Sequence, residues 1–126
     1  MSTLVFHHGA LGDSVLIWPL LRALDRATLV APMGKAKLAA RWVAGIAALD
    51  GETTDHTRMF VPQAKAECSD AWRARLAGAS TIISFVSTGN DAWAVNARAM
   101  APNAAMAFVR PRPSDNDAPT HLMNFH

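Results

Sequence analysis

The sequence predicts an α/β fold, a Rossmann-like three-layer sandwich in which helices cover both faces of a mostly parallel sheet. Short apolar, β-branched segments alternate with segments of helical periodicity along most of the chain. The helical segments are roughly ten residues long, which suits right-handed crossovers between parallel strands. The length of 126 residues and the apolar content of 51% fit one domain with a buried core.

The first half of the chain carries the clearer alternation. A strand is expected over Thr3–His7, followed by a helix over Ser14–Asp25 that has apolar residues on almost every face. A second strand is expected over Ala27–Ala31 and a second helix over Met33–Gly45. Ile46–Leu49 is either another short strand or the end of that helix.

The middle of the chain begins with a polar, turn-rich stretch, DGETTDHT (50–57). Arg58–Val61 is expected to form a brief strand. Ser69 is a good N-cap residue for a helix that runs through Leu76 and is closed by Gly78.

The last third contains the strongest strand pattern, STIISFVS (Ser80–Ser87). A helix over Ala92–Ala101, stopped by a proline, and a strand over Ala104–Val109 are expected to follow. Residues 1–110 should therefore form the domain. The proline-rich, polar segment 111–126 is expected to be an extended tail or an interdomain linker.

Charge and cysteine content exclude several classes of protein. The net charge is only +2, and the basic residues are scattered rather than gathered in a stripe, which argues against a nucleic-acid partner. Cys68 is the single cysteine, so no internal disulfide or cysteine-rich zinc site is expected. The N-terminus lacks the basic region of a signal peptide, and the apolar run Val15–Leu21 is too short to span a membrane. A cytoplasmic protein is expected.

The turn after the first predicted strand, HHGALGD (7–13), is the main candidate site. Gly9 and Gly12 allow a sharp turn and expose amide groups at the start of a helix. In parallel sheets, ligands bind beyond the carboxyl ends of the strands, and the first loop borders the point where the strand order reverses. The loop matches neither GxxxxGK[ST] nor GxGxxG, so no nucleotide cofactor is predicted there.

Asp13 ends this turn, and its carboxylate has two compatible interpretations. It can be the N-cap of the following helix, accepting backbone N–H bonds. A carboxylate kept ionised by a helix N-terminus at the mouth of a crevice is also a ready general base for a hydroxyl.

Other polar residues border the same predicted crevice. His8 is expected to line it, whereas His7 points to the opposite side of the strand and is expected to be structural. Ser87, Thr88 and Asn90 follow the strongest strand and can hydrogen-bond substrate hydroxyls, but Asn90 or Asp91 can equally cap the next helix. The histidine spacing supports no metal site. Cys68 is expected to be inert, and the four tryptophans to be core or interface residues.

The run FHHGALGDSVLIWPLLRAL (6–24) resembles the N-terminal segment of the ADP-heptose:lipopolysaccharide heptosyltransferases, glycosyltransferase family 9. In that family an opening strand leads into a G-x-x-G-D turn and a leucine-rich helix that contains a proline. The segments ARWVAG (40–45), STIISFVS (80–87) and RPRP (110–113), with His121 beyond them, agree in outline. The resemblance thus extends over nearly all of the chain.

The resemblance implies the N-terminal, acceptor-binding half of a GT-B glycosyltransferase. In the family, an acid at the position of Asp13 takes the proton from an acceptor hydroxyl, whose oxygen then displaces the nucleoside diphosphate with inversion. No metal or other cofactor is required. The residues expected to contact substrate are His8, Gly9, Ala10, Leu11, Gly12, Ser87, Thr88 and Asn90.

The chain departs from the family in length, because its members are roughly twice as long and contain two domains of ordinary size. The donor-binding domain is expected to be missing, so that this chain alone should not transfer sugar. The partners implied are a nucleotide-sugar donor, bound through that domain, and a glycan acceptor of the lipopolysaccharide type. At most peripheral contact with the inner face of the cytoplasmic membrane is expected. The alternative is a stand-alone, non-enzymatic module that binds a small ligand or self-associates through the exposed cleft face.

Overall fold

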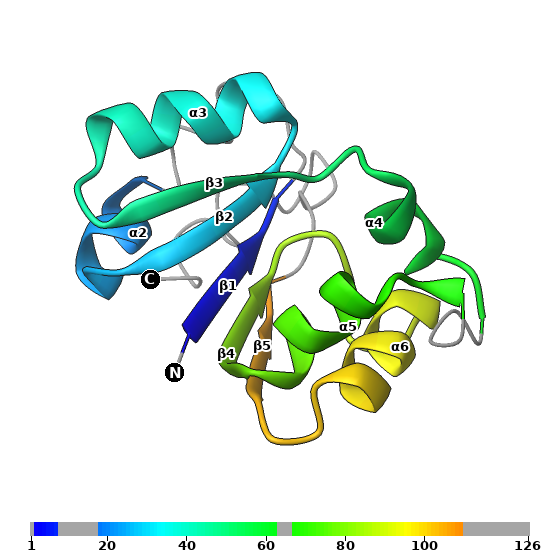
Figure 1. Ribbon diagram of the computed structural model, residues 1–126. Coiled ribbons are helices and arrows are strands. Elements are labelled where there is room, and N and C mark those ends of the chain that lie inside the picture. Colours follow the sequence, from blue (N-terminus) through cyan, green and yellow to red (C-terminus); the bar gives the residue numbers. More distant parts are fainter. Residues whose placement is uncertain (1, 8–17, 63–66, 110–126) are drawn as a thin grey trace, which may run out of the picture.

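The protein is described by a computed structural model that covers residues 2–7, 18–62 and 67–109 (Figure 1). In these residues the sheet has five strands in the order β3-β2-β1-β4-β5, and every neighbouring pair is parallel. The strands are β1 (Ser2–Phe6), β2 (Ala27–Ala31), β3 (Ile46–Asp50), β4 (Ala79–Ser84) and β5 (Ala105–Phe108). The predicted α/β Rossmann-like fold class is confirmed.

Helices cover both faces of the sheet and so make three layers (Figure 1). One face carries α2 (Trp18–Leu24) and α3 (Met33–Trp42), and the other carries α5 (Asp70–Ala77) and α6 (Ala92–Met100). A short helix, α4 (Thr54–Arg58), follows the carboxyl end of β3. The described helices include none that is long and apolar enough to cross a membrane.

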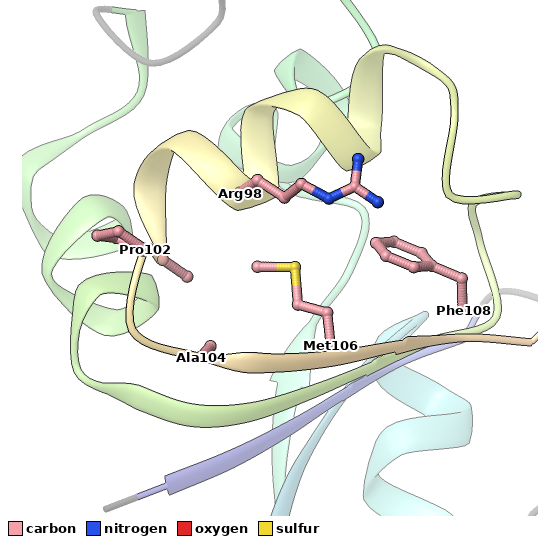
Figure 2. Close-up of a pocket in the computed structure, with 6 residues that line it drawn as sticks. Arg98, Pro102, Ala104, Met106 and Phe108 are labelled. Carbon is pink, nitrogen blue, oxygen red and sulfur yellow. The ribbon is translucent and has the colours of Figure 1, made fainter.

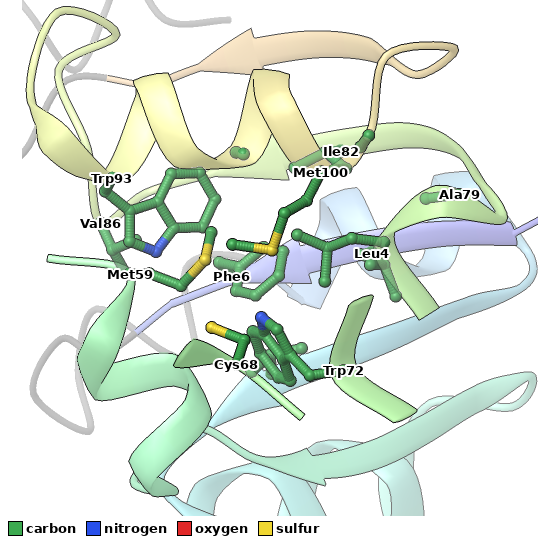
Figure 3. Packing of buried hydrophobic residues seen from close by; sticks show 14 residues of the cluster. Leu4, Phe6, Met59, Cys68, Trp72, Ala79, Ile82, Val86, Trp93 and Met100 are labelled. Carbon is green, nitrogen blue, oxygen red and sulfur yellow. The ribbon is translucent and has the colours of Figure 1, made fainter. Parts of the chain in front are cut away.

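The alternation of side chains along β1 divides the interior into two clusters. Val5 packs with the α2 and α3 face, in a cluster of aliphatic side chains that we call the aliphatic cluster. Leu4 and Phe6 point to the opposite face and pack with Trp72 of α5 and Trp93 of α6 (Figure 3). We call this second group the aromatic cluster.

The structure resolves the ambiguity at residues 46–49 in favour of a strand. β3 pairs with β2 in continuous register from Ile46 with Ala27 to Asp50 with Ala31. The turn before β3 requires glycine, because Gly45 has a φ of +84° and a Cβ there would lie 1.9 Å from the carbonyl oxygen of Asp25. The preceding helix therefore ends at Trp42, three residues earlier than expected.

The expected strand over Arg58–Val61 is wrong, because this region contains α4 followed by turns. The Thr53 hydroxyl caps α4 by accepting a hydrogen bond from the backbone N–H of His56. After the helix, the amide nitrogen of Asn96 donates to the carbonyl oxygens of Met59 and Val61. A distant side chain thus satisfies backbone groups that a strand would have paired with a neighbour.

The other boundaries are close to those expected. Ser69 caps α5 by accepting from the backbone N–H of Trp72, as predicted. β4 is shorter than predicted and ends at Ser84, after which the chain turns, although Phe85 still donates to the carbonyl oxygen of Phe6. The start of the first predicted helix and the tail 111–126 lie outside the described residues.

Candidate functional site

The strand order fixes where the sheet can bind a ligand. The chain runs outward from β1 through β2 to β3, and then fills the other side with β4 and β5, so the order reverses between β1 and β4. At such a point the loops that follow the two strands diverge and leave a crevice. The described residues there are His7, directly after β1, and the loop Phe85–Asp91 after β4.

His7 is held at this edge by backbone and ring contacts. Its N–H donates to the carbonyl oxygen of Val30 at 3.0 Å, which continues the pairing of β1 with β2. The imidazole is buried, and its ring lies edge-on to Phe85 with the centroids 5.3 Å apart. His7 therefore anchors the start of the segment that leads to α2.

The loop after β4 is organised by Ser87 and Asp91. The Ser87 hydroxyl is buried; it donates to Asp91 Oδ1 at 2.5 Å and accepts from the N–H of Gly89 at 3.1 Å. Asp91 is the N-cap of α6 and accepts from the N–H of Ala94 at 3.1 Å. The cap is therefore Asp91, whereas the side chains of Thr88 and Asn90 are exposed.

These bonds set the charge state of Asp91. Burial acts to raise the pKa of Asp91, but hydrogen bonds from Ser87 and from the N–H of Ala94 outweigh it and lower the pKa. The carboxylate is thus ionised at neutral pH and is engaged with its own loop. Thr88 and Asn90 are the polar side chains of this loop that remain open to a ligand.

The remaining predicted site residues cannot be located in the same way. His8, Gly9, Ala10, Leu11, Gly12 and Asp13 lie outside the described residues. In the chain they follow His7, directly after β1, and precede Trp18, the first described residue of α2.

A buried histidine that the sequence analysis did not single out lies in the aromatic cluster. His56 of α4 is 4% exposed, and its ring stacks on Phe6 with the centroids 5.3 Å apart and an angle of 25° between the planes. Trp72 and Phe60 also pack against the ring, at centroid distances of 5.8 Å and 5.5 Å. Its short, polar sequence context gave no periodic signal that could have predicted burial.

The partners of the two ring nitrogens determine the tautomer of His56. Nδ1 lies 2.7 Å from the carbonyl oxygen of Gly51, which can only accept, so Nδ1 carries the proton. Trp93 Nε1, which can only donate, lies 3.0 Å from Nε2. The ring is therefore neutral and links the turn after β3 with the first turn of α6.

A positive charge on this ring would be costly. A proton on Nε2 would face the indole N–H of Trp93, and the lost bond would cost about 1–3 kcal/mol. Burying the charge adds a cost of several kcal/mol. The surrounding rings could return at most about 2 kcal/mol through cation–π attraction. The neutral form is thus strongly favoured in the folded state.

Asp55 ties α4 to the start of α5. Its two carboxylate oxygens accept from the backbone N–H and the hydroxyl of Ser69, at 2.8 Å and 2.7 Å, and these bonds lower the pKa of Asp55. Burial raises the pKa of the neighbouring Cys68 thiol, which suits the expectation of an inert cysteine. The indole nitrogen of Trp72 is buried with no hydrogen-bond partner within the described part of the chain.

A shallow hollow of about 410 Å³ lies between α6 and β5 (Figure 2). Arg98 of α6 borders it, with the guanidinium carbon 5.2 Å from the centre of the Phe108 ring. Met106 and Phe108 of β5, together with the turn after α6, supply an apolar floor. The hollow contains none of the residues predicted from the sequence to bind substrate.

Within residues 2–7, 18–62 and 67–109, no group of three or more histidine, cysteine or acidic side chains is placed to hold a metal ion. Comparisons of the chain with protein-family models, with curated proteins and with solved structures find no match.

Proposed function

We propose that this chain is the acceptor-binding domain of a heptosyltransferase-like, inverting glycosyltransferase. One observation carries the proposal: the strand order reverses beside β1, and the G-x-x-G-D motif begins two residues after His7 at that edge. The motif thus directly follows the strand beside which a parallel sheet of this order usually binds its ligand. The type of reaction is inferred from the resemblance of residues 6–24 to the heptosyltransferases.

In this proposal Asp13 is the general base. Its carboxylate takes the proton of an acceptor hydroxyl while that oxygen attacks the anomeric carbon of the donor sugar. The bond to the nucleoside diphosphate breaks, and the configuration inverts. The exposed side chains of Thr88 and Asn90, at the rim of the crevice, are available to hydrogen-bond the acceptor.

The proposal is tested with the full-length natural protein. The assay measures the release of ADP from ADP-heptose in the presence of a lipopolysaccharide core acceptor. Asp13→Asn should lower turnover by about 10²–10⁴-fold, the usual contribution of a general base. The matched control is Asp25→Asn, which makes the same chemical change at an exposed residue. Because Asp25 has a φ of +68°, asparagine is well tolerated there. Near-normal turnover of Asp13→Asn would remove Asp13 from the mechanism.

An assembly module remains the second candidate, and the edge of the sheet favours it. β5 pairs only with β4 in the described sheet, and Ala105 and Ala107 are exposed on it. An uncharged edge strand beside an open hollow is a surface that another chain can extend. Sedimentation velocity over a hundredfold concentration range separates the candidates: self-association without sugar transfer supports the module, and a monomer that transfers sugar supports the enzyme.

A further inference from the structure

His56 connects three parts of the fold: the end of β1, the turn after β3 and the first turn of α6. It accepts a hydrogen bond from Trp93 in the first turn of α6, directly after the loop Phe85–Asp91. It stacks on Phe6, the last residue of β1, and its Nδ1–H donates to Gly51, directly after β3. These contacts require the neutral ring, because protonated Nε2 would be a donor facing a donor.

We propose that His56 is a proton-sensitive latch. In its neutral form it holds α4 and the turn after β3 against the first turn of α6. Protonation of His56 breaks its hydrogen bond with Trp93 and separates α4 from the first turn of α6. The adjacent loop Phe85–Asp91 then loses part of its support. The inference goes beyond the proposed glycosyl transfer and does not depend on it.

The other groups near His56 do not explain a transition in the same pH range. Among the described residues, the titratable side chains within six positions of His56 are Asp50, Glu52, Asp55 and Arg58, and the Cys68 thiol donates to the carbonyl oxygen of Asp55. β1 and α6 contribute the uncharged side chains of Phe6 and Trp93. The lowered pKa of Asp55 and the raised pKa of Cys68 keep both charge states constant between about pH 5 and pH 7.5.

The sign of the effect follows from proton linkage. The folded ring resists protonation, whereas the ring in the opened state titrates near pH 6.5, the ordinary value for histidine. The opened state therefore binds more protons, and the latch loses strength as the pH falls below about 6.5. If the closed ring stays neutral, the equilibrium constant for opening rises about tenfold between pH 7.5 and pH 5.5.

The test is hydrogen exchange of the backbone amides of the full chain, measured by NMR and corrected for the intrinsic effect of pH. Amides of α4 should show the roughly tenfold rise in opening, while those of β1 and β2 should not. The ring nitrogens of His56 should report the Nδ1–H tautomer at pH 7.5. Because this measurement needs no substitution, it stands even if a variant fails to fold.

Two variants identify the titrating group. His56→Gln keeps an acceptor for Trp93 but cannot titrate, so α4 opening should change less than about twofold over the same pH range. His7→Gln removes the other histidine that is buried in the described part of the chain, on the opposite side of β1, and should leave the tenfold change intact. The latch is overturned if α4 opening in the unaltered chain does not depend on pH, or if His56→Gln retains the full dependence.

Discussion

The two faces of the sheet are packed with different kinds of side chains. The aliphatic cluster, under α2 and α3, consists of aliphatic side chains, with small alanines at Ala36 and Ala39 where α3 approaches the sheet. The aromatic cluster, under α5 and α6, combines Phe6, Trp72 and Trp93. On that face the buried polar side chains of His56 and Asn96 bond to Trp93 and to backbone carbonyls.

The two clusters are stabilised by different kinds of contact. Aliphatic contacts are non-directional, so a side chain of similar volume can replace another at modest cost. The hydrogen bonds of the aromatic face are directional and buried, so removing one partner leaves the other unsatisfied. We therefore expect the aromatic face to tolerate substitution less well than the aliphatic face.

The largest difference in stability between the two faces is expected when one conservative substitution is made on each of them. Trp93→Phe keeps an aromatic ring but removes the N–H that His56 accepts, and should cost about 3 kcal/mol through the lost volume and the unsatisfied nitrogen. Leu29→Met, at a residue of the aliphatic cluster that is 2% exposed, should cost less than about 1.5 kcal/mol. Urea unfolding measures both, and equal costs would contradict the proposed difference between the faces.

A smaller effect is expected where a polar side chain is replaced by an apolar one of similar shape. Asn96→Leu should cost about 2 kcal/mol, because the carbonyls of Met59 and Val61 lose their donor. The neighbouring Val95 is 59% exposed, and Val95→Ala should change stability by no more than about 0.5 kcal/mol. If Asn96→Leu is neutral in urea unfolding, the aromatic face does not depend on its polar contacts.

The smallest effect concerns the loop at the crevice. Asp91→Ala should cost about 1 kcal/mol at pH 7, because α6 loses its cap. Since the folded state lowers the pKa of Asp91, its contribution is present above the ordinary carboxyl pKa and disappears as the pH falls through the lowered value. The stability difference from the unaltered chain should therefore shrink in acid. Asn90→Ala, on the adjacent exposed residue, should lack both effects; if it matches Asp91→Ala, the cap assignment is wrong.

The aliphatic face was largely predictable from the sequence. Ala27–Ala31 has the predicted bounds, and the helix that begins at Met33 was expected at that residue. Its elements carry local signals, such as apolar runs and a glycine at position 45 where the turn requires positive φ. The same kind of signal predicted the Ser69 cap of α5.

The polar contacts of the aromatic face were not predictable. The helix Thr54–Arg58 was missed because it has no apolar periodicity, although Thr53 and Asp55 are typical of a helix start. Its position depends on Asn96 and Trp93, which lie about 40 residues further along the chain. At the crevice, either Asn90 or Asp91 could have capped α6, and only the structure distinguishes them. The roles of Asp13 and His8 stay predictions, because both lie outside the described residues.

The sequence by itself determined most of the strands and helices around a parallel sheet, because alternating periodicity and cap residues act over a few neighbouring positions. The tertiary structure decided which polar groups are buried together. His56 is neutral and enclosed only because Gly51, Trp93 and Phe6 meet around it, and contacts between such distant residues leave no local pattern in the chain.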